Sequence, residues 1–218
     1  GPTVEALDPA RLITNRSSGR MGVLMAQAAK FRGAEVDLIH GPLNVPQSWL
    51  EGLKTYPVND SIGMQKNLND LQPSADAVAM AAAIADLKQK GGSTKNKLSK
   101  QSLLCSMENN FELTPDLLLE IVQRRMTGQV ILGFAALTGN DSQIKAAGQE
   151  KINRKGCDLL MANPIDRKGQ GFDENFNGGF LLGPNGMVKS MPRTSKLSLA
   201  HQLLDALIAL NPNISQNI

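Results

Sequence analysis

Aromatic side chains are scarce in this chain of 218 residues, which has one Trp, one Tyr and six Phe. The core must therefore be built from Leu, Ile, Val, Ala and Met. Few rings also leave little material for a platform on which single-stranded nucleic acid would stack. The net charge of +3 is small and no block of Lys and Arg stands out, so the sequence also disfavours DNA binding.

Cysteine and histidine are scarcer still. Cys105 and Cys157 lie far apart and form no CxxC pair, which argues against a disulfide framework and a zinc site. His40 and His201 are the only histidines, and no HExxH motif accompanies them. No apolar run has the length of a membrane span, and no signal peptide opens the chain. These absences predict a cytoplasmic protein with reduced thiols that binds neither membranes nor nucleic acids.

The sequence does contain an alternation of strand-like and helix-like segments, which is typical of a parallel sheet covered by helices. Strands are predicted over residues 35–39, 54–58, 76–80, 129–135 and 158–161. Helices are predicted over residues 18–32, 61–71, 114–125, 141–155 and 195–210. Ser61 and Thr114 are the expected N-caps, Pro115 takes the first helical position, and Gly33 and Gly156 follow helix ends. The sequence therefore predicts an α/β fold with a Rossmann-like, doubly wound, mostly parallel sheet.

Two segments interrupt this alternation. Residues 88–101 are polar and rich in Lys, Gly and Ser, and they predict a mobile flap rather than a regular element. Residues 164–177 predict a loop that leads into a late β-hairpin, in which residues 179–182 turn through 183–186 into 187–190.

The chain is predicted to be a single domain over residues 1–218. Gly1-Pro2-Thr3 is typical of the loop that follows a strand, and a doubly wound sheet normally begins with such a strand. We therefore expect that the first strand of the sheet is not included in this sequence.

A polar loop over residues 8–22, DPARLITNRSSGRMG, runs into the first predicted helix. Backbone N–H groups at such a helix start can bind a phosphate together with Ser hydroxyls and flanking arginines. The side chains concerned are Ser17, Ser18, Arg11, Arg16 and Arg20. A capped surface turn with solvated arginines is the alternative. The loop is neither a Walker motif nor a GxGxxG motif.

Residues 80–86 place small side chains and then Asp86 at the carboxyl end of a buried strand. Ligands of open α/β sheets bind at that end. Small side chains let a flat ring approach the backbone, and Asp86 can accept from ribose hydroxyls or hold a magnesium ion. The alternative is a tight strand–loop junction in which Asp86 is a cap.

Two groups of lysines can neutralise phosphate charge. Lys95, Lys97 and Lys100 lie in the flap, where a lysine can close over a leaving pyrophosphate. Lys151 and Lys155 are four residues apart and share one helix face, where a bound anion would remove their mutual repulsion. A hydrated loop and a solvated helix face are the respective alternatives.

Together these stretches resemble the bacterial phosphopantothenate–cysteine ligase family, which is often found as the C-terminal half of a fused coenzyme A biosynthesis protein. The resemblance covers nearly the whole chain and rests above all on the DPxRxxTNxSSGxMG pattern of residues 8–22. The other matching stretches follow in order: Gly1-Pro2-Thr3, Ala82-Ala83-Ile84-Ala85-Asp86, Lys97-Leu98-Ser99-Lys100, Thr114-Pro115-Asp116-Leu117, Gly133-Phe134-Ala135-Ala136, Lys151 with Lys155 and Asp158, Ala162-Asn163-Pro164 and Ser195-Lys196.

The resemblance implies a two-step ligation. The carboxylate of phosphopantothenate attacks the α-phosphate of CTP and releases pyrophosphate, and the amine of cysteine then attacks the acyl-cytidylate and releases CMP. The resemblance further implies Mg²⁺ or another divalent cation with CTP as co-substrate. It also implies a homodimer and a fused or associated flavin-dependent phosphopantothenoylcysteine decarboxylase.

Site residues follow from the same resemblance. Asn15 would steady the acyl-cytidylate and polarise its carbonyl, Arg11 would support the Asn15 loop, and Lys97 would reach the phosphates from the flap. Phosphopantothenate would be held by Asn15, Ser17, Ser18 and Gly19. The CTP site would comprise Lys97 together with Met80, Ala81, Ala82, Asp86, Thr114, Pro115, Asp116, Leu117, Phe134, Lys151 and Lys155, with the backbone of residues 80–82 reading cytosine. No metal ligand is assigned.

Three departures from the family pattern bear on these assignments. Thr114 stands where the family usually has Asn, and Leu137 stands where it usually has Glu. The flap is one residue longer than expected, which leaves Lys95 as an alternative to Lys97.

Two other functions stay open. One is a nicotinamide-dependent Rossmann oxidoreductase, which is disfavoured by the absence of GxGxxG and of a Tyr-x-x-x-Lys pair. The other is a non-catalytic nucleotide-binding domain.

Overall fold

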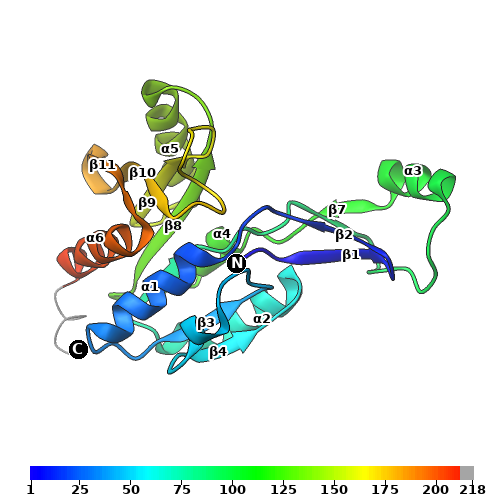
Figure 1. The fold of residues 1–218 in the computed structure, drawn as a ribbon, viewed down its shortest axis with the longest axis horizontal. Coiled ribbons are helices and arrows are strands. Elements are labelled where there is room, and N and C mark those ends of the chain that lie inside the picture. The colour runs from blue at the N-terminus through cyan, green and yellow to red at the C-terminus, as the bar shows by residue number, and fades with distance from the viewer. Residues whose placement is uncertain (212–218) are drawn as a thin grey trace.

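The computed structural model describes residues 1–211 and has a mixed α/β architecture (Figure 1). Its central sheet has five strands in the order β11-β10-β9-β8-β5. Strands β5, β8 and β9 run parallel, and β10 and β11 are added antiparallel. Their bounds are Ala77–Met80 for β5, Val130–Leu137 for β8, Leu159–Pro164 for β9, Phe176–Leu182 for β10 and Val188–Ser195 for β11. The predicted α/β class and the late β-hairpin are confirmed.

Helices cover both faces of this sheet. One face packs against α2, α4 and α5, and the other packs against α1 and α6. Along β8, Ile131 belongs to the first core and Leu132 to the second, because successive side chains of a strand point to opposite faces. The helices span Arg20–Phe31 for α1, Ser61–Leu71 for α2, Leu117–Gln123 for α4, Asp141–Lys155 for α5 and Lys196–Leu210 for α6. All five predicted helices are therefore present.

A parallel pair of strands forms a separate small sheet. It consists of β3, Asp37–His40, and β4, Lys54–Pro57. Both strands match segments predicted from the sequence, but within residues 1–211 neither pairs with the central sheet. Strands β3 and β5 are therefore both edge strands, and they line opposite sides of a cavity of about 790 Å³.

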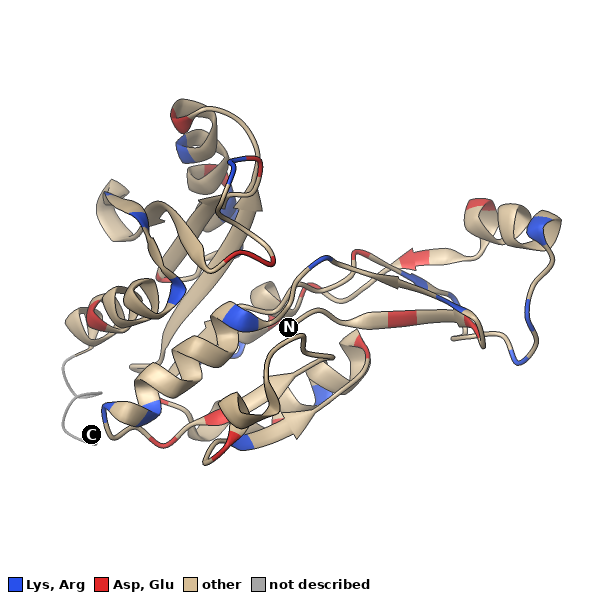
Figure 2. Ribbon diagram, in the orientation of Figure 1, with Lys and Arg blue, Asp and Glu red and all other residues tan. Residues whose placement is uncertain are grey.

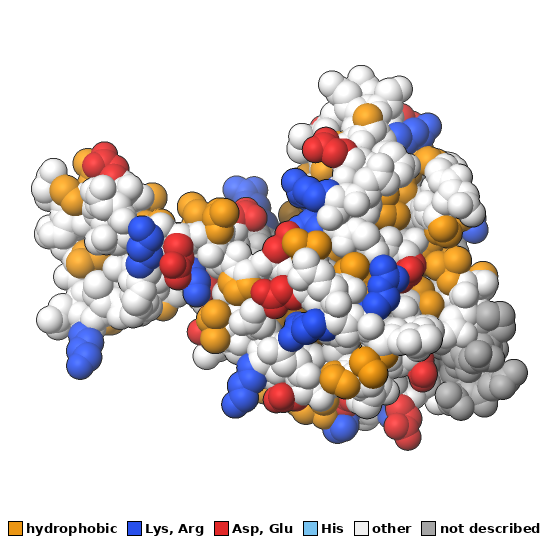
Figure 3. All heavy atoms as spheres, turned by 180° about the vertical axis from the view of Figure 1, so that it is seen from behind, with side chains coloured by type: hydrophobic (Ala, Val, Ile, Leu, Met, Phe, Trp, Pro, Cys, Tyr) orange, Lys and Arg blue, Asp and Glu red, His pale blue; other side chains and the backbone are white. Residues whose placement is uncertain are grey.

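Antiparallel strands and one helix form an arm that projects from the body (Figure 1, Figure 3). Its elements are β1, Val4–Asp8, paired with β2, Arg11–Thr14; β6, Leu87–Gln89, paired with β7, Phe111–Leu113; and α3, Lys100–Asn109. The prediction of one continuous polar loop over residues 8–22 is therefore wrong, since part of it is β2. The predicted flap, residues 88–101, is wrong at both ends, where Lys88 lies in β6 and Lys100 in α3.

Helix starts differ from the prediction by one or two residues. Asp60, rather than Ser61, is the N-cap of α2, and Asp116, rather than Thr114, is the N-cap of α4. Each carboxylate accepts from an N–H three residues further on, at 2.8 and 3.2 Å respectively. Pro115 therefore precedes α4 instead of occupying its first turn.

The surface mixes charges of both signs. Basic and acidic residues are interspersed over the body and the arm (Figure 2). This mixture differs from the basic stripe by which nucleic-acid-binding proteins are recognised. Within residues 1–211, no helix is long and apolar enough to cross a bilayer.

The centre of the sheet provides a test of the core. Leu160 on β9 is 0% exposed and packs between the strands and the α2, α4 and α5 layer. Leu160→Ala should lower the free energy of unfolding by about 2–5 kcal/mol, because it removes buried carbon atoms and leaves a cavity. Urea denaturation followed by circular dichroism measures this change. Met126→Ala, at a side chain 50% exposed, is the control and should change stability by less than about 0.5 kcal/mol. Equal losses in the two variants would contradict this description of the core.

Candidate functional site

Three segments meet at the carboxyl end of β5: the first residues of the chain, the end of β2 and the loop that follows β5. The Nδ2 atom of Asn15 donates to the carbonyl oxygens of Ala83 and Ile84, at 3.1 and 2.8 Å. The N–H of Thr3 donates to the Ala83 carbonyl at 3.2 Å, and the Thr3 hydroxyl accepts from the N–H of Ala85 at 3.0 Å. Asn15 and Thr3 therefore fix the path of the loop after β5.

The same loop continues to Asp86 and is tied to the residues before α4. The Thr114 hydroxyl donates to the carbonyl of Ala85 at 2.5 Å, and the Thr114 N–H donates to the carbonyl of Asp86 at 3.1 Å. The side chain of Asp86 is exposed. Thr114 is not a helix cap, but it holds Asp86 close to the start of α4.

Charged side chains at the N-cap of α4 and in α5 lie near this point. Lys155 forms an ion pair with Asp116. The pKa of Lys151 is lowered, first because burial disfavours its ammonium charge and then because Lys155 and Arg154 are close, while Asp86 and Asp116 act in the opposite direction. The structure therefore brings four predicted CTP-site residues into one electrostatic cluster. An anion bound there would relieve the repulsion between the lysines.

Helix α1 begins without a side-chain cap. Gly19 occupies the N-cap position with φ at 77°, and no side chain of residues 1–211 caps the N–H groups that follow it. The other α-helices of the same range each have a capping side chain. A Cβ on Gly19 would lie 3.1 Å from the Cα of Gly1, so this close approach also favours glycine. Ser17, Ser18 and Gly19 thus lead into uncapped N–H groups, which suit an anion.

Arg11 lies at the far end of β2 from Asn15. Its Nε lies 3.1 Å from Oδ2 of Asp8, and its guanidinium also donates to the carbonyl of Leu98. Asp8 accepts from the N–H of Leu98 at 3.2 Å. Arg11 and Asp8 therefore hold the flap beside Lys97, while the support of the Asn15 loop by Arg11 stays a prediction. Because β2 is four residues long, Arg11 and Asn15 lie about 13 Å apart along the strand.

The charge of Asp8 maintains this flap contact. Burial opposes ionisation of Asp8, but the N–H groups of Ala10 and Leu98 and the positive charge of Arg11 outweigh it, so the pKa falls below the ordinary 3.8. The stabilisation from ionised Asp8 is therefore present above the ordinary pKa and is lost as the pH falls through the lowered value.

The remaining predicted residues lie elsewhere. Met80, Ala81, Ala82 and Gly19 line the cavity of about 790 Å³, whereas Asn15, Asp86, Lys151 and Lys155 lie outside it. Phe134 packs against the α1 and α6 core, which is the other face of the sheet from α4 and α5. Leu117 is buried in the α4 core, so only its backbone is available to a ligand. The side chains of Lys95 and Lys97 are exposed.

Two residues of this site were not identified from the sequence as site residues. Asp8 had a local signal, because Asp-Pro-Ala-Arg is a tight turn in which the Asp8 carboxylate accepts from the N–H of Ala10 at 2.8 Å. No local sequence pattern indicated Thr3, because its partners Ala83 and Ala85 come from a distant part of the chain.

These residues could hold a divalent cation only if substrate phosphates supplied further ligands. The described part of the chain has no group of three or more His, Cys, Asp or Glu side chains that could hold a metal ion by itself. Mg²⁺ is, however, often held by one or two carboxylates together with substrate phosphates. Asp116 is already paired with Lys155, so Asp86 is the better carboxylate for such a role.

The flap contact can be tested by proteolysis. Arg11→Ala should speed trypsin cleavage after Lys95 and Lys97 in the native protein about tenfold or more, because hydrogen bonds to charged groups contribute about 1.5–3 kcal/mol each. Mass spectrometry of the first fragments measures the rates. Arg16→Ala removes an exposed arginine of the same segment and is the matched control. Equal cleavage rates in the two variants would show that Arg11 does not hold the flap.

Residues 1–210 match the family described as the DNA/pantothenate metabolism flavoprotein C-terminal domain. The coenzyme A biosynthesis bifunctional protein CoaBC of Bacillus subtilis is 33% identical over 212 residues, which cover 97% of this chain and 50% of that protein. The protein of the same name from Vibrio vulnificus is 35% identical over 214 residues, which cover 94% of this chain and 49% of that protein. The chain therefore spans about half the length of the curated relatives it matches.

Solved structures give a consistent result. The C-terminal domain of a coenzyme A biosynthesis bifunctional protein CoaBC superposes with a TM-score of 0.77 at 26% identity, covering 98% of this chain and 94% of that chain. A Cab2 mutant in complex with phosphopantothenate-cysteine gives a TM-score of 0.72 at 14% identity, over 98% of this chain and 85% of that chain, which is a likeness of fold alone. Because the family match covers nearly every residue and curated relatives exceed 30% identity, the chain belongs to the family of DNA/pantothenate metabolism flavoprotein C-terminal domains.

Proposed function

We propose that this chain is a phosphopantothenate–cysteine ligase of coenzyme A biosynthesis, which uses CTP to form the amide between 4′-phosphopantothenate and L-cysteine. The observation that carries the proposal is the family match over residues 1–210, which includes Asn15 and the loop that Asn15 fixes. Curated relatives are named for coenzyme A biosynthesis, and a protein of the same fold has been solved with phosphopantothenate-cysteine. The nicotinamide-dependent alternative has no comparable support.

The first step would use the charged cluster and the flap. The carboxylate of phosphopantothenate attacks the α-phosphorus of CTP, the bond to pyrophosphate breaks, and an acyl-cytidylate forms. Lys151 and Lys155 would meet the negative charge of the triphosphate, and Lys97 would approach it from the flap. Burial lowers the pKa of Lys151, so an anion beside it would favour its charged form.

The second step would use Asn15. The amine of cysteine attacks the acyl carbon, CMP leaves, and negative charge develops on the carbonyl oxygen. Both N–H groups of the Asn15 amide are donated to Ala83 and Ile84. Donation to the oxyanion would replace one of these bonds, while the other keeps the amide oriented. The bond that remains would limit the reorganisation of the amide to the exchange of one hydrogen bond, and oriented donors of this kind lower barriers at oxyanions.

The start of α1 would hold the phosphate of phosphopantothenate. Its uncapped N–H groups follow Ser17, Ser18 and Gly19, and a helix N-terminus favours an anion. Asn15 lies two residues before Ser17 in the chain. One extended phosphopantothenate molecule could therefore place its phosphate at the start of α1 and its acyl carbon at Asn15.

The enzyme would also need a cation and a partner subunit. Mg²⁺ or another divalent cation would accompany CTP, with Asp86 as a carboxylate partner. The active form would be a homodimer, fused or associated with a flavin-dependent phosphopantothenoylcysteine decarboxylase. A cytoplasmic location agrees with the free thiol of Cys105, which is exposed.

A nucleotide panel tests the proposal. Pyrophosphate release should require CTP, phosphopantothenate and cysteine together, and omission of cysteine should allow at most one equivalent. ATP, GTP and UTP should support much slower turnover than CTP. Release that does not depend on phosphopantothenate, or hydride transfer from a nicotinamide cofactor, would overturn the assignment.

Asn15→Asp should slow cysteine capture about 100- to 1,000-fold beyond any loss of CTP affinity, because a carboxylate repels the oxyanion and cannot donate to it or to the carbonyls of Ala83 and Ile84. Single-turnover conversion of the acyl-cytidylate measures this step, and calorimetry measures CTP affinity. Thr14→Val is the control, since it removes the nearby bond from the Thr14 hydroxyl to the Thr3 carbonyl, at 2.8 Å, without changing the amide. If Thr14→Val slows cysteine capture as much as Asn15→Asp does, Asn15 acts only through the structure of the junction.

Lys97→Gln should lower the rate of pyrophosphate release about tenfold or more with the fold intact, because one positive charge opposite the leaving pyrophosphate is lost. Lys95→Gln removes another exposed positive charge two residues away and is the matched control. Burst kinetics of both variants measure the activation step. A larger defect in Lys95→Gln would transfer the flap role to Lys95.

A further inference from the structure

The buried face of α6 has a lysine at one end. This face packs against α1 and the sheet through side chains spaced three or four residues apart. Leu199, Ala200 and Leu203 are 0% exposed, and Leu207 is 3% exposed. Lys196 holds the next position of the same row, in the first turn of the helix, and is 4% exposed. A charged side chain therefore stands where helical periodicity favours an apolar one.

The ammonium group of Lys196 has no hydrogen bond and no ion pair to any other residue in the range 1–211. Burial and then the positive charge of Arg20 lower the pKa of Lys196 to about 8. The carboxylates of Asp173 and Glu174 act in the opposite direction but are not within ion-pair distance. Because burial of a charge costs free energy unless the charge is paired, a partner for this ammonium is needed.

Lys196 lies beside the first residue of α1. The N–H of Lys196 donates to the carbonyl of Asn175 at 3.0 Å, and the Arg20 guanidinium donates to Oδ1 of Asn175 at 2.6 Å. The guanidinium of Arg20 also lies 5.8 Å from the centre of the Trp49 ring. Its Nε is buried and has no hydrogen-bond partner in the described part of the chain. Two cationic side chains with unpaired donors are therefore neighbours at the start of α1.

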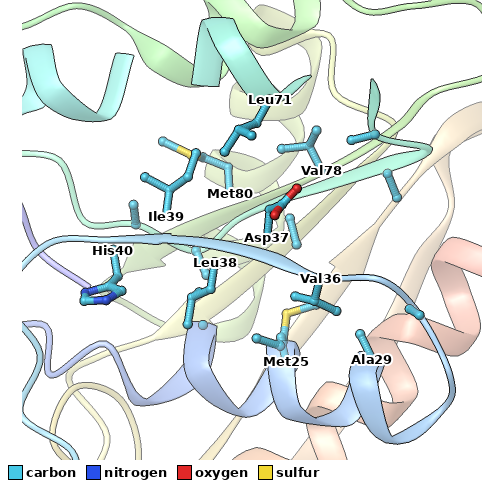
Figure 4. A pocket seen from close by; sticks show the side chains of 18 of the residues that line it. Met25, Ala29, Val36, Asp37, Leu38, Ile39, His40, Leu71, Val78 and Met80 are labelled. Atoms are coloured by element: carbon cyan, nitrogen blue, oxygen red, sulfur yellow. The ribbon is translucent and has the colours of Figure 1, made fainter. Parts of the chain in front are cut away.

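The N–H groups that follow Gly19 are the third component of this site, since no side chain of residues 1–211 caps them. The positive end of a helix disfavours cations beside it unless an anion also binds there. Met25 and Ala29, further along α1, line the cavity of about 790 Å³ (Figure 4). Lys196 is not among the residues that line this cavity. The anion that matches Lys196 therefore belongs at the start of α1 rather than in the cavity.

We propose that Lys196 binds the phosphate of 4′-phosphopantothenate, together with Arg20 and the N–H groups at the start of α1, and thereby selects phosphopantothenate over pantothenate. This inference rests on the proposed function, because that function names the substrate. A phosphate dianion can accept from all of these donors, and hydrogen bonds between charged groups are stronger than neutral ones. The phosphate is unchanged in the ligation, so Lys196 is a binding residue and takes no part in the chemistry.

Lys196→Met separates this role from a role in packing. The apolar side chain has a similar length and completes the buried row, so urea denaturation without ligand should show equal or higher stability than in the wild type. Lys189→Met removes an exposed lysine of β11 and is the matched control, which should change neither stability nor affinity. Lower stability of Lys196→Met with unchanged affinity for phosphopantothenate would overturn the proposal.

Calorimetric titration of the intact chain with phosphopantothenate and with pantothenate isolates the contact to the phosphate. Lys196→Met should weaken phosphopantothenate binding about tenfold or more and leave pantothenate binding unchanged, because only the first ligand offers the lysine an anion. Equal losses for the two ligands, or no loss for either, would contradict the inference alone. A wild-type chain that does not bind phosphopantothenate would refute the proposed function and the inference together.

Proton uptake gives a readout on the unmodified chain. At pH 9 most Lys196 side chains of the free protein are neutral, since their pKa is about 8. A bound phosphate dianion favours the ammonium form and raises this pKa, so binding should take up about half a proton or more. Calorimetry in two buffers of different ionisation enthalpy measures the uptake. Pantothenate with the wild type, and phosphopantothenate with Lys196→Met, should show none. Binding of phosphopantothenate to the wild type without uptake would overturn the assignment of Lys196.

Discussion

The two hydrogen bonds from Asn15 to the carbonyls of Ala83 and Ile84 are the constraint on which the site depends. They join the end of β2 to the loop that leaves β5. From that loop, Thr114 extends the connection to the start of α4 through Ala85 and Asp86. The arm, the central sheet and the charged helices therefore share one junction. The proposed chemistry needs this arrangement, because an acyl group and a triphosphate must be held together.

The junction also separates rigid parts of the molecule from adjustable ones. The loop after β5 rests on a core in which Ile131, Leu132 and Leu160 are fully buried. The flap, by contrast, is held to the hairpin through Asp8 and Arg11, and its lysines are exposed. In the proposed mechanism, a flap lysine would approach the triphosphate from a distance. Acyl transfer would then proceed at fixed groups, while pyrophosphate release would depend on the movement of the flap.

Local sequence patterns account for the helices and strands that were predicted correctly. Gly156 ends α5 with φ at 72°, and the buried runs of β8 and β9 are plain in the sequence. Helix α3 was missed because its side chains give no apolar period: only Ser106 is buried, while Leu104 and Met107 are exposed. A helix without a buried stripe cannot be recognised by periodicity.

The site was predictable only in part. The polar stretch before α1 and the lysine pair of α5 had local signals, and the role of Asn15 came from a family resemblance, whereas the contacts that join these residues are long-range. Lys155 and Asp116 are 39 residues apart, and Thr3 and Ala85 are 82 apart, so no local pattern pairs them. The contact of Arg11 with the flap was not predicted for the same reason, since its partner Leu98 is 87 residues away.

Amide hydrogen exchange with and without CTP tests most directly whether these segments form one nucleotide site. If they do, CTP slows exchange together in residues 81–86, in the first turn of α4 and in the last turn of α5. Calorimetry under the same conditions establishes that CTP is bound. Bound CTP with protection at only one of these segments, or at none, would contradict a site built around the Asn15 junction.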